Sequence, residues 1–138
     1  ITLGRVGLCF SQGMDADAIN APEINAQVRS SLALARAQGL KTTVSGGVSA
    51  DSLPFFRALE PGLLTRFETR KVVFDAATAL EGDPERGILA ALAFELFYLK
   101  NKMTFFRTIK ASDLARMNHL EQIYWRAIAH TVPAGDPA

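Results

Sequence analysis

The chain is poor in the residues that most often mark small enzymes and secreted domains: it has one cysteine, one tryptophan and two histidines in 138 residues. A single Cys9 excludes an internal disulfide, and its apolar neighbours predict a buried side chain in a cytoplasmic protein. His119 and His130 stand apart from any carboxylate pattern, which predicts surface residues. Zinc-ligand spacing, a Ser-His-Asp order and a Walker loop are all missing from the sequence.

An excess of one charge and a long apolar run are missing too. Fifteen basic residues balance fourteen acidic ones, which leaves no field to gather nucleic acid or an anionic membrane. The most apolar stretch, 87–99, is shorter than the roughly 20 residues of a membrane helix and contains Glu95. We therefore expect neither nucleic acid nor a membrane as a partner. Because residue 1 is Ile and leads straight toward a strand, we expect the chain to be a portion of a larger protein.

The first half of the chain alternates strand-like and helix-like segments, the pattern of a parallel sheet with crossover helices. We expect strands at residues 6–10, 40–45 and 63–67. A helix is expected from Pro22 to Gly39, with a second at residues 50–59. The stripe that the first helix would turn toward the sheet consists of Ile24, Val28, Leu32 and Ala35.

The end of the third strand is ambiguous. We favour an end near Phe67 or Glu68 followed by a loop at 68–70, although the alternation would also allow a strand that continues to Phe74. A helical stripe would begin at Val73 and include Ala76, Ala77 and Leu80.

From Asp83 onward the pattern is helical, with Asp83 as the cap and Pro84 in the first turn. Residues 88–99 are apolar on nearly every side, so they need cover on more than one face. A separate last helix is expected from Ser112 or Asp113 to about His130, followed by a tail at 131–138. We divide the chain into barrel-like βα-units at 1–82 and a helical extension at 83–138, an expected oligomerisation element.

Three strands leave two exposed sheet edges, which is an aggregation hazard unless something covers them. The simplest solution is an α/β fold in which these are the last three βα-units of an eight-stranded TIM barrel, followed by long C-terminal helices. An open three-layer sheet built by dimerisation is the alternative.

In a TIM barrel three loops of this chain would face the active site. One is the Ser45-Gly46-Gly47 turn, whose backbone N–H groups suit a phosphate or a carboxylate. The alternative is a tight turn capped by Ser49 that binds no ligand.

The other two loops carry charge. Asp15 and Asp17 offer oxygen ligands for magnesium or manganese, or else cap a short helical turn. Arg66 and Arg70 flank Glu68, either to clamp a substrate anion or as a structural ion-pair cluster. The expected substrate-binding residues are Ser45, Gly46, Gly47 and Arg70.

The run 6–15, a helix opening at Pro22-Glu23 and the segment 35–41 before a strand resemble the later part of the HpcH/HpaI aldolase/citrate lyase family of phosphoenolpyruvate/pyruvate-type TIM barrels. The resemblance covers residues 6–80. It implies a metal-dependent carbon–carbon lyase for 2-oxo acids or related carboxylates, in which magnesium or manganese stabilises an enolate. It also implies Asp15 as a metal ligand and a homo-oligomer built through the C-terminal helices.

The chain departs from that family at residues 12–14, where Gln-Gly-Met replaces the usual Gly-Pro before the loop Asp. The family's other metal and substrate ligands lie on earlier strands that are absent here, so this portion alone is expected to be inactive.

Two alternatives stay open. Residues 44–48 resemble the phosphate grip of ribulose-phosphate epimerase-type barrels, which would make the ligand a sugar phosphate, although Arg66-Phe67-Glu68 stands where a second glycine-rich turn would be. A non-catalytic dimerising domain is the other possibility, for which Asp15→Ala and Arg70→Ala would change nothing measurable.

Overall fold

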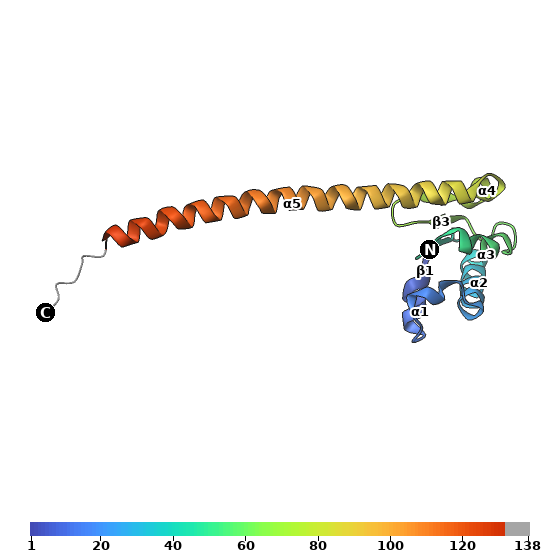
Figure 1. Ribbon diagram of the computed structural model, residues 1–138. Helices are drawn as coiled ribbons and strands as arrows, with labels where there is room; N and C mark the ends of the chain where they lie inside the picture. Colours follow the sequence, from blue (N-terminus) through green and yellow to red (C-terminus); the bar gives the residue numbers. More distant parts are fainter. Residues whose placement is uncertain (132–138) are drawn as a thin grey trace. The chain divides into compact units, whose positions relative to one another are not determined.

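The computed structural model describes the backbone of residues 1–131 and the side chains of residues 1–126. The chain divides into two compact units, Ile1–Leu96 and Phe97–Ala138. The first unit is a mixed α/β structure built on a four-stranded sheet, so the α/β class predicted from the sequence is confirmed (Figure 1).

The sheet has the strand order β1-β2-β3-β4. Its strands are β1 (Thr2–Gly4), β2 (Thr43–Ser45), β3 (Arg66–Glu68) and β4 (Val73–Asp75). The first three strands are parallel, with Val44 paired to Leu3 on one side and to Phe67 on the other. Strand β4 runs antiparallel to β3 and pairs Phe74 with Phe67. The carboxyl ends of three strands therefore meet at one edge of the sheet.

The helices of the first unit follow the strands closely. They are α1 (Arg5–Ser11), η1 (Ala16–Asn20), α2 (Pro22–Ala37), η2 (Ala50–Ser52), α3 (Leu53–Arg57) and α4 (Ala76–Glu81), and α5 (Pro84–Thr131) begins here. The predicted helix from Pro22 is confirmed: Pro22 opens α2, and Gly39 follows its end with φ of 73°. All four residues of the predicted stripe are buried.

The predicted first strand at 6–10 is wrong, because these residues form α1. Residues 2–4 take the place beside β2 instead, with Thr2 paired to Thr43. Arg5 and Cys9, four residues apart, are both fully buried, which is the spacing of one helical face. A five-residue apolar run fits a buried helix as well as a strand.

The favoured end of the third strand near Phe67 or Glu68 is confirmed, because β3 ends at Glu68, but the segment after it differs from prediction. The second and third strands lie at 43–45 and 66–68, and residue 73 belongs to a fourth strand instead of a helix. The Thr69 N–H donates to the Val72 carbonyl at 2.9 Å, and the Val72 N–H donates to the Thr69 Oγ1 at 3.2 Å. This tight turn reverses the chain and stacks Phe74 on Phe67, with ring centroids 4.9 Å apart. The chain therefore neither continues as one strand to Phe74 nor enters the helix before Ala76. The expected helix at 50–59 is divided into η2 and α3, which ends at Arg57.

The core lies between the sheet and the helices. Its fully buried side chains come from α2, from the sheet, from the η2–α3 segment and from the start of α5; they include Ile24, Leu32, Val44, Phe56, Phe67 and Ile88. Burying such side chains is the main source of stability for a sheet with three-residue strands.

Helix α5 is one continuous helix where two were expected. Asp83 caps it as predicted, since its Oδ1 accepts the Arg86 N–H at 3.1 Å. The predicted start at Ser112 or Asp113 is wrong, because residues 88–131 contain no Gly or Pro to interrupt the hydrogen bonds. Residues 132–138, most of the expected tail, lie outside the described residues, as does the His130 side chain. Within the described part of the chain, no helix is long and apolar enough to span a membrane.

Candidate functional site

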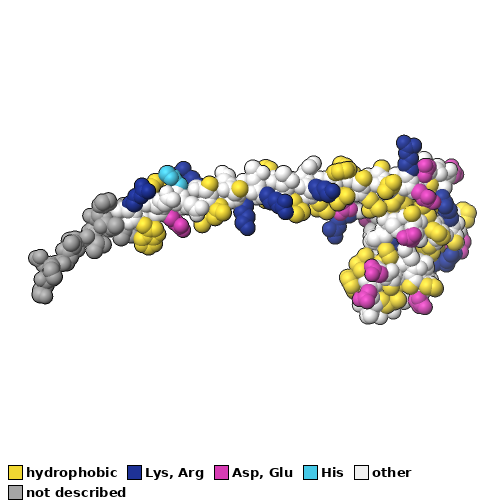
Figure 2. Space-filling view, in the orientation of Figure 1, with side chains coloured by type: hydrophobic (Ala, Val, Ile, Leu, Met, Phe, Trp, Pro, Cys, Tyr) yellow, Lys and Arg dark blue, Asp and Glu magenta, His cyan; other side chains and the backbone are white. Residues whose placement is uncertain are grey.

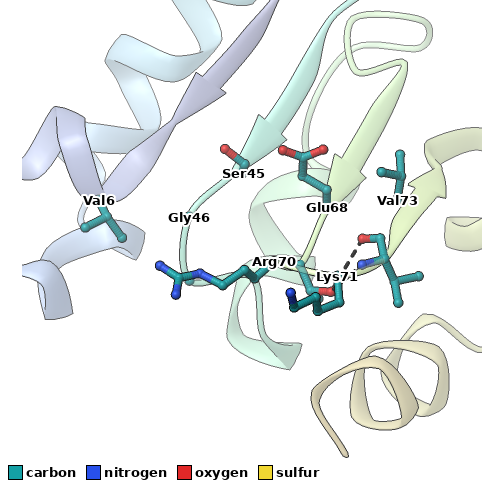
Figure 3. Close-up of a pocket in the computed structure, with 10 residues that line it drawn as sticks. Val6, Ser45, Gly46, Glu68, Arg70, Lys71 and Val73 are labelled. Carbon is teal, nitrogen blue, oxygen red and sulfur yellow. Dashed lines mark hydrogen bonds between the residues drawn. The ribbon is translucent and has the colours of Figure 1, made fainter. Parts of the chain in front are cut away.

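A pocket of about 510 Å³ lies at the carboxyl ends of the three parallel strands (Figure 3). The β2 end supplies Ser45, Gly46 and Gly47, the β3 end supplies Glu68, and the β3–β4 turn supplies Arg70 and Lys71. The structure thus brings together all four predicted substrate-binding residues. It adds Lys71, which the sequence analysis missed although two consecutive basic residues in one loop were the signal for it.

Both the backbone conformation of the turn and the residues that pack against it require glycine. Gly46 and Gly47 have φ of 83° and 64°, which L side chains rarely adopt. A Cβ on Gly46 would lie 2.9 Å from the backbone N of Val6 and 3.0 Å from that of Arg5. Gly46 is therefore required by the start of α1, whether or not a ligand binds to the turn.

Ser49 follows this turn as the N-terminal cap residue of η2. Its carbonyl accepts the Ser52 N–H at 3.0 Å, and its own N–H donates to the Ser52 Oγ at 3.3 Å. The turn is consequently tied to the next helical segment, as a capped βα-turn should be.

The charges of the pocket come from the end of β3 and from the tight turn that follows it. Glu68 is half-buried, whereas Arg70 and Lys71 are exposed. Figure 3 shows the Arg70 side chain extending toward the turn at Gly46, with Ser45 and Glu68 on neighbouring strands. This arrangement can hold an anion between the Arg70 guanidinium and the glycine turn, with one carboxylate beside it.

Arg66, expected beside Glu68, does not line the pocket. It lies opposite Asp75 in the β3–β4 ladder, where the hydrogen bonds from Thr78 and, to a smaller extent, the Arg66 charge lower the pKa of the Asp75 carboxyl. The expected cluster of two arginines around one glutamate is therefore divided between the pocket and the ladder.

Asp15, the expected metal ligand, lies elsewhere. It is exposed at the N-terminal cap position of η1, where its carbonyl accepts the Ala18 N–H at 3.1 Å, and it does not line the pocket. Among the described residues, no group of three His, Cys, Asp or Glu side chains could hold a metal ion. The metal ligand that the family resemblance implies at Asp15 therefore stays a prediction, and no chemical step is assigned to a metal.

Behind the glycine turn lies Arg5, which the sequence analysis did not single out. Its side chain is fully buried, donating to the Asn20 Oδ1 at 2.8 Å and to the Ser52 Oγ at 2.9 Å. Burial lowers its pKa to about 10, an effect that Cys9 partly offsets. Arg5 thereby connects α1 to η1 and η2. It also holds in place the start of α1, which lies against the glycine turn.

No family model, no curated protein and no solved structure matches this chain. The resemblance to the aldolase/citrate lyase family therefore stays a prediction based on the residues quoted above.

Proposed function

We propose that the pocket binds a small carboxylate, such as a 2-oxo acid, and that the chain is a portion of a carbon–carbon lyase of the aldolase/citrate lyase kind. The observation that carries the proposal is the meeting of the Gly46-Gly47 turn with Arg70 and Lys71 at the carboxyl ends of three parallel strands. In a TIM barrel, which we propose for the parent protein, the active site lies at this end of the strands.

The composition of the pocket favours a carboxylate over a phosphate. Arg70 can donate two parallel hydrogen bonds to a carboxylate, and the Ser45 hydroxyl offers a further donor. Glu68 adds a negative charge beside the same space, which weakens the attraction for a phosphate dianion and also favours pyruvate, a monoanion, over oxaloacetate, a dianion. Glu68 is also a carboxylate that lines the pocket, which makes it the candidate to accept a proton from a bound ligand.

Magnesium or manganese belongs to the proposal only through the family resemblance. Asp15 would be the ligand from this chain, and the metal would stabilise an enolate. Because Asp15 lies outside the pocket, the carboxylate site is proposed independently of the metal.

A sugar-phosphate site is the second candidate, supported by the glycine pair and the two adjacent cations. Against it, the segment after β3 is a hairpin turn closed by Thr69 and Val72 instead of a second glycine-rich turn.

The test is a titration of the full chain with pyruvate and oxaloacetate at millimolar concentration, followed by melting temperature. Ligands that bind only the folded state raise this temperature. We expect a rise that Arg70→Met abolishes and Arg86→Met retains, because Arg86 is an exposed α5 residue that does not line the pocket.

Two further measurements separate the parts of the proposal. Repeating the titration with magnesium or manganese tests the metal: an additional rise that Asp15→Ala removes supports it, and one that survives Asp15→Ala rejects Asp15 as the ligand. No shift with either 2-oxo acid contradicts the carboxylate site, and a shift with sugar phosphates alone favours the second candidate.

A further inference from the structure

The second unit exposes a regular line of large side chains. Their positions alternate in steps of four and three residues, which is the heptad spacing of a coiled coil. We call them the α5 seam: Leu99, Met103, Phe106, Lys110, Asp113, Met117, Leu120 and Tyr124. The six apolar members are 45–59% exposed, and Figure 2 shows hydrophobic side chains along this helix between Lys and Arg side chains.

Three shallow hollows on the surface of α5 follow the same line. Each is lined only by seam residues and by their heptad neighbours that flank a coiled-coil core. The central hollow, for example, lies among Phe106, Ile109, Lys110, Asp113, Leu114 and Met117. In a coiled coil, each core side chain of one helix enters such a hole in the facing helix.

The two charged residues of the α5 seam, Lys110 and Asp113, indicate which helix can pack on this surface and in which direction. In a parallel pair, Lys110 would face Lys110 and Asp113 would face Asp113 of the second copy, two repulsions in the middle of the interface. In an antiparallel pair, Lys110 faces Asp113 of the second copy and Asp113 faces its Lys110. The helix is therefore complementary in charge to itself when reversed.

The same antiparallel register matches the remaining seam residues. It sets Phe106 against Met117, Met103 against Leu120 and Leu99 against Tyr124 of the second copy. Beside the seam it brings Lys100 opposite Glu121, a further attraction. A shift by one heptad would instead place Lys110 against Phe106 or Leu120, so a single register satisfies both charge and packing.

We infer that residues 99–124 form an antiparallel two-stranded coiled coil with a second copy of this chain, with its twofold axis between Lys110 and Asp113. The inference rests on the α5 seam alone and is independent of the proposed function. Burial of the apolar seam residues stabilises the pair, and the central Lys–Asp pairs fix its direction and register.

Light scattering and sedimentation of the full chain across the micromolar range test this inference. We expect a dimer of twice 15.0 kDa. Asp113→Lys should raise the dimer dissociation constant by at least about tenfold, because it sets lysine against lysine. The exchange variant K110D/D113K should restore the dimer, since the opposite charges face each other again, and circular dichroism checks that each variant keeps its helix.

Disulfide trapping tests the direction. A mixture of Met103→Cys and Leu120→Cys chains should cross-link, whereas neither variant alone should; the unchanged chain controls for the buried Cys9. Cross-linking of Met103→Cys with itself would overturn the antiparallel arrangement. A monomer at all concentrations, a higher oligomer, or an exchange variant that stays monomeric would overturn the dimer. Binding of the chain to anionic vesicles as a monomer would also overturn it.

Discussion

The guanidinium of Arg5 lies 5.5 Å from the centroid of the Phe56 ring and is fully buried. Its hydrogen-bond partners, Asn20 and Ser52, are neutral side chains, so a positive charge is held in the core by dipoles and an aromatic face. We therefore expect the packing of α1 behind the glycine turn to depend strongly on Arg5.

Arg5→Ala is expected to lower the free energy of unfolding by about 3 kcal/mol, because it removes packing, one buried hydrogen bond and one part-buried hydrogen bond at once. Arg5→Met should cost less, since the unbranched side chain still packs on Phe56. Chemical denaturation measures both, with exposed Arg57→Ala as the control. Equal losses for Ala and Met would show that packing on Phe56 contributes little.

The same residue predicts a dependence of stability on alkaline pH. Burial lowers the pKa of Arg5 to about 10, so the folded protein releases this proton before the unfolded chain does, and stability rises as the pH passes 10. Relative to Arg5→Met, the wild-type chain should gain about 1 kcal/mol between pH 9 and pH 11. Parallel pH profiles of the two proteins would contradict a depressed pKa at this site.

Gly46→Ala should destabilise the first unit more than Gly13→Ala does. Both glycines have positive φ, but only Gly46 has backbone atoms within 3.0 Å of the position of a Cβ, whereas Gly13 has nothing within 4 Å. We expect about 1 kcal/mol for Gly13→Ala from conformation alone and about 3 kcal/mol for Gly46→Ala. Urea unfolding of the two variants measures the difference, and equal costs would mean that α1 shifts to make room.

Asp75 should contribute stability that is lost in acid. The Thr78 N–H and Oγ1 donate to its Oδ1 at 3.1 and 3.0 Å, and with the Arg66 charge they hold the pKa of this carboxyl below its ordinary value of 3.8. The contribution is therefore complete above that value and disappears as the pH falls through the folded-state pKa. Asp75→Ala should lower the melting temperature at pH 7, by an amount that shrinks as the pH falls below 3.8, and Thr78→Val should give a smaller effect.

Phe67→Ala should cost about 3–5 kcal/mol, because this side chain is fully buried between Phe56 and Phe74. Phe10→Ala is the matched control, since Phe10 is 63% exposed and should change stability by less than about 0.5 kcal/mol. A small loss for Phe67→Ala would show that the β3–β4 hairpin does not anchor the core.

Helices that carry their own capping residues and apolar stripes could be predicted from the sequence. Pro22, Gly39 and the apolar stripe between them define α2 without help from the rest of the fold, and Asp83 with Pro84 defines the start of α5. Ser45, Gly46 and Gly47 were predicted for the same reason, because a glycine pair after a strand marks a turn at the carboxyl edge of a sheet, whereas Lys71 was missed.

The sequence was insufficient to predict the segments whose secondary structure depends on contacts between distant strands. Residues 6–10 suit a strand and a helix equally, and only the pairing of Thr2–Gly4 with β2 excludes the strand. β4 depends on the contact of Phe74 with Phe67, which no local pattern contains. Asp15 was placed near the pocket by its distance from a strand that is in fact a helix.

Arg70 and Lys71 occupy the two central positions of the turn that Thr69 and Val72 close. Their reach into the pocket is therefore set by the register of β3 on β4. One inserted residue would shift the register of β4 by one residue. Phe74 would then point to the other face of the sheet, away from Phe67, because successive strand residues face opposite sides. The length of the turn should therefore be more tightly constrained than the side chains at its two central positions. One insertion or deletion would disturb both the folding of the hairpin and the binding of the proposed ligand.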